Sequence, residues 1–412
     1  MESELKDLSA SKQISAEPGD ESHPESSRKD ERPLLKIGSE TVVYDLAEME
    51  KKYAAYVRHD IYGTMGQGPF PLIEKLLLGF AIVTLVPLRF VLGLLILFVY
   101  YLICRLCTLF SVPFREEEQE DYAHLTGIRR TVIVQCGRLL SRAMLFVLGF
   151  YWIKETYRIP DQVGSNSGEK LAGENEHTEV SDRPGAIISN HISYLDILYH
   201  MSSSFPSFVA KRSVARLPLV GLIRKGTEHS AKSCSFMYYI YSKCLGCVYV
   251  QRESKTLDFK GVSGVVTERV QAAHQNKLAP KMMLFPEGTT TNGDFLLPFK
   301  TGAFLCKAPI LPVILQYPYE RFSPAWDTIS GIRHVFLLFC QFVNYIEVIH
   351  LPVYYPSPEE KEDPKLYANN VRKLMASEGN LILSDIGLAE KRIYHSALNG
   401  NSLPSVLHHK EE

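Results

Sequence analysis

The chain has 412 residues, 46% of them hydrophobic, with 45 basic and 46 acidic side chains and 8 cysteines. It is longer than the roughly 250–300 residues at which a single core usually stops growing, so we expect one large domain with added segments, or two domains. The net charge of -1 argues against a nucleic-acid protein that is basic throughout, the mean hydropathy of -0.05 against a polytopic transporter, and the few cysteines against a disulfide scaffold.

Charge is unevenly distributed along the chain. Residues 1–32 hold 9 acids and 5 bases, residues 115–121 hold 5 and 1, and residues 161–182 hold 6 and 1. Residues 183–300 hold 15 bases and 7 acids, a net charge of +8. We therefore expect anionic ligands to bind within 183–300.

A membrane-scale apolar segment runs from Leu76 to Leu102, 27 residues in which Arg89 is the one charge. As a helix rising about 1.5 Å per residue it is longer than the ~30 Å hydrocarbon layer of a bilayer. It must therefore tilt, or bend near Pro87–Arg89 as a re-entrant hairpin. A second apolar stretch, Thr131 to Ile153, is interrupted by two arginines one turn apart, which suits an interfacial helix or one that pairs with the first.

These features divide the N-terminal part of the chain. Residues 1–40 are polar, acidic and without hydrophobic period, and we expect a disordered tail. Residues 70–156 form the predicted membrane-associated helical region, whose number of crossings stays open. Residues 157–183 form an acidic linker.

Beyond the linker, short apolar runs alternate with stretches long enough for helices. The runs are Ala186–Ser189, Phe208–Ala210, Cys247–Val250, Met282–Phe285, Ile310–Leu315 and Tyr345–Val353, and the helical stretches include Leu257–Gln275 and Pro364–Glu378. This alternation predicts an α/β domain over residues 184–390, with a mixed, mainly parallel sheet flanked by helices. Residues 391–412 form a C-terminal tail.

A His-x4-Asp pattern, His191 to Asp196, directly follows the predicted strand Ala186–Ser189. A strand-to-helix turn places polar side chains at the carboxyl edge of a sheet, where α/β proteins bind ligands. With Ser193 as the helix N-cap, Asp196 at position N3 can reach back to His191, fix its tautomer and strengthen it as a base. Ser193-x-x-Asp196 is also the pattern of an ordinary capping box, in which His191 has no catalytic role.

Three further blocks follow predicted strands. Arg252 ends the strand after Gly246, where its guanidinium could clamp a phosphate or simply cap the strand. The turn at Pro286-Glu287-Gly288 brings a carboxylate and backbone N–H groups to the same edge, or is only a turn. The third block, at Phe299–Phe304, adds the cation Lys300.

These blocks, in this order and behind a membrane-scale segment, resemble the glycerolipid acyltransferase family, which uses acyl-CoA. The matching positions lie within about residues 184–316 and are His191/Asp196, Gly246/Arg252, Phe285–Thr289 and Ala308–Pro312. Within the family, Thr289–Gly293 and Gly246–Arg252 look like the lysophosphatidylcholine and lysophosphatidylethanolamine branch, and the chain is particularly similar to plant lysophosphatidylethanolamine acyltransferases. The chain departs from the family in two respects. Tyr249 stands where many members have Phe. The EF-hand pairs of longer members are also missing, so we expect no calcium regulation.

The resemblance implies direct acyl transfer. His191, oriented by Asp196, takes the proton of the free hydroxyl of a lysophospholipid, expected at sn-2, and the oxygen attacks the acyl-CoA thioester. Arg252 is expected to hold the acceptor phosphate. The other expected substrate-binding residues are Gly246, Glu287, Gly288, Thr289, Lys211 and Lys300. Of these, the two lysines are expected to contact the anionic headgroup or the CoA phosphates.

The resemblance also implies that no metal or bound cofactor is needed, because acyl-CoA is a co-substrate. It implies residence in the endoplasmic reticulum membrane, with the site facing the cytosol. Nothing in the sequence sets the oligomeric state.

Other readings stay open. The same chemistry could act on lysophosphatidic acid or run as a CoA-independent transacylation, and a membrane-bound lipid-binding scaffold could keep the fold without catalysis. Two CxxC pairs, Cys104/Cys107 and Cys244/Cys247, form a formal zinc pattern, and the first pair is also a candidate for palmitoylation. The +8 stretch lacks a recognisable nucleic-acid-binding module.

Overall fold

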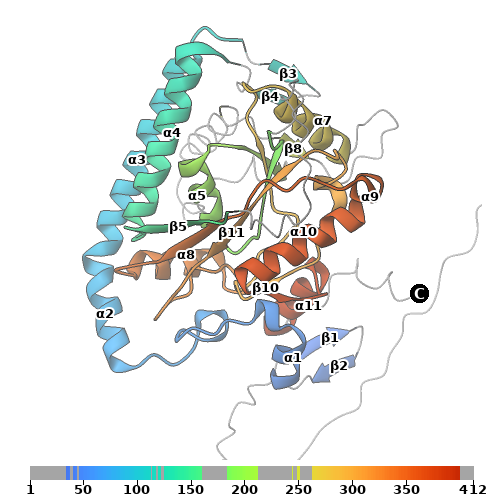
Figure 1. Ribbon diagram of the computed structural model, residues 1–412. Coiled ribbons are helices and arrows are strands. Elements are labelled where there is room, and N and C mark those ends of the chain that lie inside the picture. Colours follow the sequence, from blue (N-terminus) through green and yellow to red (C-terminus); the bar gives the residue numbers. More distant parts are fainter. Residues whose placement is uncertain are drawn as a thin grey trace, which may run out of the picture.

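The computed structural model, drawn in Figure 1, describes residues 34–37, 40–43, 46–112, 114–116, 119–121, 125–159, 183–211, 244, 248–250 and 262–399. Its centre is a seven-stranded sheet with the order β5-β12-β11-β6-β9-β7-β8. In that order the strands are Ile153–Tyr157, Ile346–His350, Ile310–Gln316, Ala186–Ser189, Met282–Leu284, Ser207–Lys211 and Val248–Val250. Every neighbouring pair is parallel except β11 and β12. The predicted mixed, mainly parallel sheet is therefore confirmed.

Alternation along the central strands builds two hydrophobic cores, one on each face of the sheet. In β6, Ile187 points into a core shared with α3, α4, α5 and α8, whereas Ala186 and Ile188 point into a core shared with α7 and α10. Successive side chains of a strand face opposite sides, so a strand covered on both faces is apolar at every position. This burial explains why the central strands β6, β9 and β11 read as nearly continuous apolar runs.

Helices cover both faces. The helices of the C-terminal part are α5 (Leu195–Ser203), α7 (Val262–Gln275), α8 (Gly331–Cys340), α9 (Pro358–Glu362), α10 (Pro364–Gly379) and α11 (Leu388–Leu398). The predicted helix at Pro364–Glu378 is α10, and that at Leu257–Gln275 is α7, although residues 257–261 lie outside the described residues.

The membrane-scale segment forms two helices. They are α2 (Leu72–Val83) and α3 (Leu85–Thr108), separated at Thr84. The break at Thr84 therefore lies just before Pro87–Arg89, where a bend was one of the two predicted arrangements. Pro87 lies in the first turn of α3, where backbone N–H groups have no partner within the helix, so a proline is tolerated there. In the described part of the chain, α3 is the one helix long and apolar enough to cross a membrane, with a mean hydropathy of 2.4.

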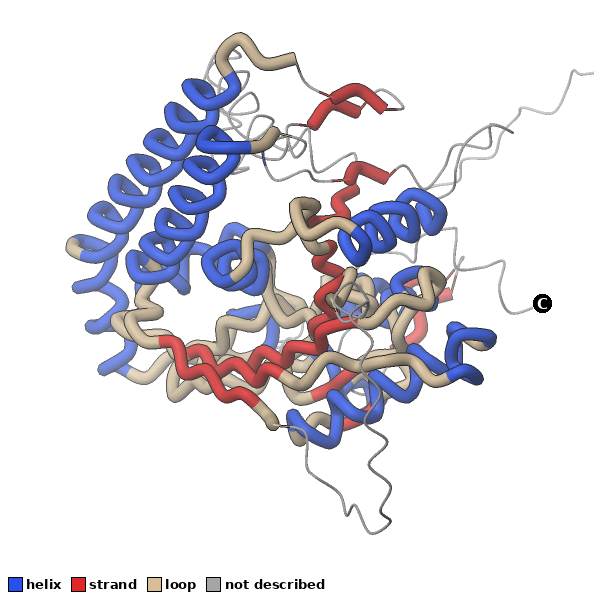
Figure 2. The backbone as a smooth tube through the Cα atoms, turned by 45° about the horizontal axis from the view of Figure 1, so that its top comes forward, coloured by secondary structure: helices blue, strands red, loops and turns tan. Residues whose placement is uncertain are grey.

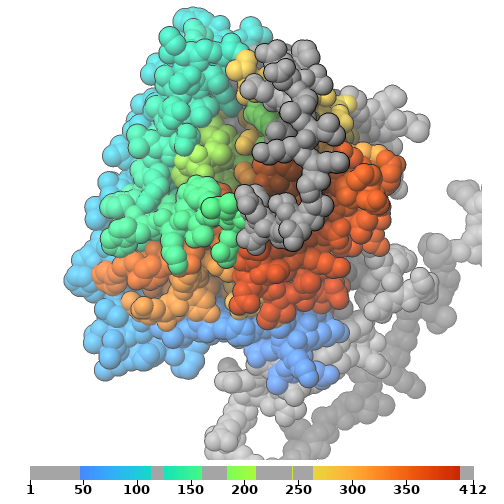
Figure 3. All heavy atoms as spheres, viewed as in Figure 1, coloured from blue at the N-terminus to red at the C-terminus, as the bar shows by residue number. Residues whose placement is uncertain are grey.

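The second apolar stretch forms α4 (Gly127–Val147), which lies beside α3 and also contacts α5 (Figures 1 and 2). Its arginines turn inward: Arg138 donates to the carbonyl of Ser202 at 3.3 Å, and Arg142 donates to the carbonyls of Phe150 and Tyr151 at 2.9 and 2.7 Å. In Figure 3 the residues of α2, α3 and α4, coloured blue to teal, form the left-hand edge of the molecule. Pairing of the two helices was one of the two arrangements expected.

Ordered elements extend into segments that we expected to lie outside the folded domain. Residues Leu34–Ile37 (β1) and Glu40–Val43 (β2) form an antiparallel hairpin at the end of the predicted tail. Strand β5, at the end of the predicted membrane region, belongs to the central sheet. Helix α11 enters the predicted C-terminal tail because Tyr394 and Ala397 are buried against the N-terminal segment.

The remaining elements are short. They are α1 (Leu46–Lys52), η1 (Ala54–Tyr56), η2 (Thr64–Gly66), β3 (Phe114–Glu116), β4 (Gln119–Asp121), β10 (Phe295–Leu296), η5 (Thr301–Ala303) and β13 (Ile382–Leu383). Strands β3 and β4 pair with each other, as do β10 and β13.

The charge inside the apolar segment, Arg89, ties α3 to the end of α8. Its buried guanidinium donates to the carbonyl of Phe339 at 2.9 Å, that of Leu338 at 3.3 Å, and that of Gln341. The last carbonyls of a helix lack intrahelical donors and attract cations. Arg89 therefore acts as a C-terminal cap supplied by another helix.

We predict that Arg89→Leu lowers the free energy of unfolding by about 3 kcal/mol, because several buried carbonyls lose a charged donor. Thermal unfolding in detergent micelles measures the change. The neighbouring Leu88→Ala, at an exposed position, is the control and should change stability by less than about 0.5 kcal/mol. Equal midpoints for the two variants would contradict the capping role.

Candidate active site

The candidate site begins in the turn between β6 and α5. Asn190 anchors this turn to the neighbouring strand, since its side chain donates to the carbonyl of Leu315 at 2.9 Å and accepts from the N–H of Leu315 at 2.8 Å. Leu315, which supplies both backbone groups, lies in β11, 125 residues further along the chain. The position of the following residue, His191, is therefore set by the sheet.

His191 and Asp196 are in contact, as the sequence predicts. The distance from His191 Nδ1 to Asp196 Oδ2 is 2.9 Å, the carboxylate is fully buried, and the imidazole side chain is 20% exposed. With Nδ1–H donating to the carboxylate, Nε2 carries the lone pair, so the ring can accept a proton from an approaching molecule. The ring of Phe285 stacks on the imidazole with centroids 4.1 Å apart.

Asp196 holds the turn as well as the histidine. Its Oδ2 also accepts the N–H groups of Ile192 at 2.7 Å and Ser193 at 3.0 Å, and its Oδ1 accepts the hydroxyl of Tyr317 at 2.7 Å. One buried carboxylate thus has four donors, which is what an ionised side chain needs in the interior. The contribution of Tyr317 is invisible in the local sequence.

The capping-box reading of this motif is wrong in one respect. Helix α5 begins at Leu195 with Tyr194 as its N-cap, and no side chain caps it. The hydroxyl of Ser193 is buried without a hydrogen-bond partner among the described residues. Asp196 accepts the N–H of Ser193, one half of a capping box, but the hydroxyl of Ser193 accepts no N–H of the helix in return.

Glu287, in the turn that follows the neighbouring strand β9, supports the same turn. Its carboxylate is buried and accepts the N–H of His191 at 2.7 Å through Oε1 and the N–H of Leu297 at 2.9 Å through Oε2. Burial raises the pKa of the Glu287 carboxyl to about 8, against the opposing effect of the two N–H donors. This contact with the backbone of His191 is a role that the sequence did not reveal.

The turn after Glu287 is tight and covered by a lysine. Gly288 has φ 71°, a conformation that favours glycine, and its N–H donates to the carbonyl of Phe285 at 3.1 Å. That N–H is therefore bonded within the turn itself. The side chain of Lys300 lies over the Cα of Gly288, where any larger side chain would collide with it. Thr289, next in the chain, is half-buried.

Of the remaining predicted residues, the structure describes Lys211. Lys211 is the last residue of β7 and pairs with Val250 of β8 in parallel register. Gly246 and Arg252 lie outside the described residues. Strands β6, β9 and β7 are parallel, so Lys211, at the end of β7, lies at the sheet edge that also bears His191 and Glu287.

The cysteine pairs do not form a described metal centre. Within the described part of the chain, no cluster of three or more His, Cys, Asp or Glu side chains could hold a metal ion. Cys104 and Cys107 belong to α3, Cys244 is buried, and Cys247 lies outside the described residues.

Comparison with known proteins places the chain among acyltransferases. The model of the family named Acyltransferase matches residues 170–316. The chain is 60% identical to the lysophospholipid acyltransferase LPEAT1 of Arabidopsis thaliana over the full length of both proteins. It is 35% identical to the lysophosphatidylcholine acyltransferase of Drosophila melanogaster over 50% of this chain and 35% of that protein. The 1-acyl-sn-glycerophosphate acyltransferase PlsC of Thermotoga maritima is a structural match with a TM-score of 0.36 and 15% identity, covering 71% of this chain and 96% of that one.

The raised pKa of Glu287 predicts a pH dependence of stability. Between its ordinary pKa and about 8 the folded protein holds a proton that the unfolded chain has lost, so the free energy of unfolding falls as pH rises through this range. We predict that Glu287→Gln, which cannot titrate, shows a smaller fall in melting temperature between about pH 5 and about pH 8.5 than the unsubstituted protein. The exposed Glu362→Gln should keep the full fall. Identical pH profiles for the two variants would contradict the prediction.

Proposed function

Because the chain belongs to the lysophospholipid acyltransferase family, we propose that it transfers an acyl group from acyl-CoA to the free hydroxyl, at sn-2, of lysophosphatidylethanolamine or a related lysophospholipid. The observation that carries the proposal is the imidazole of His191, 20% exposed and held by a buried carboxylate 2.9 Å from Nδ1. This arrangement suits a general base for a hydroxyl proton.

The reaction needs one base and no covalent intermediate. Nε2 of His191 takes the proton of the acceptor hydroxyl while the oxygen bonds to the thioester carbonyl carbon. The carbon–sulfur bond then breaks, and the departing CoA sulfur takes the proton back from Nε2, which restores the base. The buried Asp196 stabilises the imidazolium between the two steps. The nearest hydroxyl nucleophile in the turn, Ser193, is buried, which favours direct transfer in a ternary complex.

Binding of the two anionic substrates is assigned to the basic stretch 183–300, which carries 15 bases and 7 acids. Arg252 is proposed to hold the acceptor phosphate together with Gly246, and Lys211 and Lys300 to contact the headgroup or the CoA phosphates. Gly288 and Thr289 are proposed to shape the acceptor site, with Glu287 acting through the backbone of His191. No bound cofactor enters the reaction as proposed.

We further propose that the enzyme resides in the endoplasmic reticulum membrane, with its site facing the cytosolic acyl-CoA. Helix α3 supports membrane association, because 24 residues of mean hydropathy 2.4 match the thickness of a bilayer. Exposed apolar side chains of α2 and α3, including Leu76, Val83 and Val91, would otherwise face water.

An acceptor panel tests the proposed function. Purified protein receives labelled acyl-CoA with lysophosphatidylethanolamine, -choline, -serine or lysophosphatidic acid at equal surface concentration, and CoA release is measured. We predict the fastest transfer to lysophosphatidylethanolamine, and Arg252→Ala should raise the KM for each phosphate-bearing acceptor. No CoA release with any acceptor would refute acyl transfer, and faster release with lysophosphatidic acid would refute the headgroup assignment.

Replacement of the base tests the mechanism. We predict that His191→Ala lowers kcat by about 10³-fold or more with the fold intact, and that Asp196→Asn lowers it by about 10²- to 10⁴-fold, because an amide nitrogen cannot accept the donors of the turn. Tyr317→Phe, which removes one donor to the other oxygen of Asp196, is the matched control and should lower kcat by less than about 10-fold. Circular dichroism verifies folding, and a folded His191→Ala with full activity would exclude the base role.

A further inference from the structure

Two loops hold the backbone carbonyls of the catalytic turn. The N–H of Thr291 donates to the carbonyl of His191 at 3.0 Å, and the N–H of Trp326 donates to the carbonyl of Ile192 at 2.9 Å. The two loops, residues 290–293 and 322–328, are separate in the chain. The orientation of the His191–Ile192 peptide groups therefore depends on where these loops lie.

A short N-terminal segment, residues 54–60, holds both loops. The side chain of Asn292 donates to the carbonyls of Ala54 at 2.9 Å and Val57 at 3.0 Å, and its backbone N–H donates to the carbonyl of Ala55 at 2.9 Å. These contacts fix the residue directly after Thr291. The segment lies far outside residues 170–316, which match the family model.

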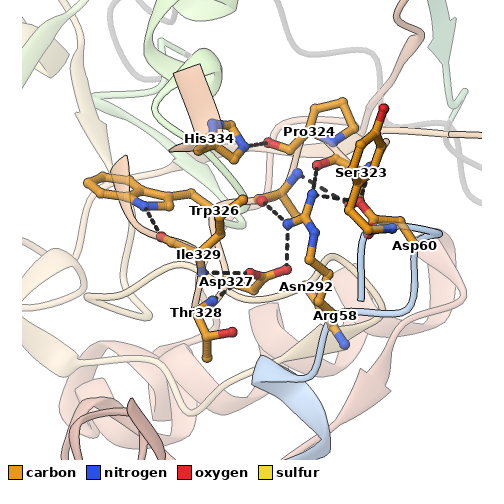
Figure 4. Close-up of polar contacts among 12 residues, drawn as sticks. Arg58, Asp60, Asn292, Ser323, Pro324, Trp326, Asp327, Thr328, Ile329 and His334 are labelled. Carbon is orange, nitrogen blue, oxygen red and sulfur yellow. Dashed lines mark hydrogen bonds and ion pairs between the residues drawn. The ribbon is translucent and has the colours of Figure 1, made fainter. Parts of the chain in front are cut away.

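Arg58 holds the other loop on both sides of Trp326, as Figure 4 shows. Its guanidinium donates to the carbonyl of Ser323 at 2.6 Å, the carbonyl of Ala325 at 3.1 Å and Oδ2 of Asp327 at 2.8 Å. Asp60 completes the network: it pairs with Arg58 at 2.7 Å and accepts the N–H of Ser323 at 2.8 Å.

Burial makes this network costly to break. The side chains of Arg58 and Asp60 are fully buried and that of Asp327 is 1% exposed. A planar guanidinium can serve several acceptors at fixed angles, whereas the ammonium of a lysine cannot reproduce that fork. Arg58 is thus the side chain through which the N-terminal segment contacts the loop on both sides of Trp326.

From these contacts we propose that Arg58 is a positioning residue for acyl transfer, acting through the 322–328 loop and the Ile192 carbonyl on the imidazole of His191. The proposal rests on the proposed function. A misplacement of the base of about 1 Å is enough to lower the rate about 10²-fold without loss of substrate binding. Asn292 serves the same purpose through Thr291 and the His191 carbonyl.

A third contact keeps the loops together when Arg58 is replaced. The ammonium of Lys391, from α11, donates to the carbonyl of Thr290 at 2.7 Å and that of Trp326 at 3.3 Å. It bridges the two loops, and it also lies over the ring of Tyr56 in the N-terminal segment, 5.4 Å from the ring centroid. Arg58 variants are therefore expected to retain the loops while losing their exact placement.

The test compares Arg58→Met and Arg58→Lys in the full-length protein with Arg333→Met. Arg333 is the matched control, because it also reaches the N-terminal part, donating to the carbonyl of Met65 at 3.4 Å, but belongs to α8. We expect Arg58→Met to lower kcat about 10²-fold, with the KM values for acyl-CoA and for the acceptor changed less than about 3-fold. Arg58→Lys should recover part of the lost rate. Arg333→Met should have the kcat of the unsubstituted protein.

Hydrogen exchange at the amides of Trp326 and Thr291 gives a second readout that does not require activity. Arg58→Met should speed exchange of the Trp326 amide more than that of Thr291, and this result stands even if the acceptor panel shows no acyl transfer. Unchanged kcat in folded Arg58→Met, or a raised KM with unchanged kcat, would overturn the proposal, as would unchanged protection of the Trp326 amide.

Asn292→Asp provides an independent variant if Arg58→Met does not fold. A carboxylate in place of the amide would face the carbonyls of Ala54 and Val57, so the loop should shift away from the segment. We expect a similar fall in kcat with KM retained, and faster exchange of the Thr291 amide. A folded Asn292→Asp with the rate and amide protection of the unsubstituted protein would overturn positioning by the N-terminal segment.

Discussion

The candidate active site depends on one buried carboxylate, Asp196, which receives four hydrogen-bond donors. Three of them come from the turn itself, at His191, Ile192 and Ser193, and the fourth from the hydroxyl of Tyr317. An unpaired charge in this environment would be strongly destabilising, so the donors and the carboxylate fix one another. The imidazole receives its tautomer and its orientation from the same contacts that allow the charge to be buried.

The sheet supplies the platform for this arrangement. Asn190 joins the turn to β11 through two hydrogen bonds, and Glu287 joins it to the turn after β9. Parallel strands end at a common edge, so residues that lie about 100 positions apart in the chain meet there. Glu287 is a backbone support for the turn, and its burial raises its pKa.

Both ends of the described chain close around the same site. The N-terminal segment and α11 share a small core that includes Tyr56, Leu297 and Tyr394, and from it Arg58 and Lys391 reach the two loops beside His191. At the opposite side, Arg89 joins the apolar helix α3 to α8, whose N-terminal end follows the loop of Trp326. The membrane-scale helices are thus linked to the site through hydrogen-bonded contacts as well as through apolar packing.

The sequence by itself determined the α/β fold class, six of the seven strands of the sheet, the pairing of His191 with Asp196 and the family, because these depend on short-range periodicity and on residues within one turn of each other. It also located the apolar segment, although the break falls at Thr84, where local backbone geometry decides. Only the tertiary structure revealed Tyr317, the backbone role of Glu287, and Arg58, whose partner Asp327 is 269 residues away. Such contacts leave no local pattern, because an arginine that will become a buried clamp looks the same in sequence as one on the surface.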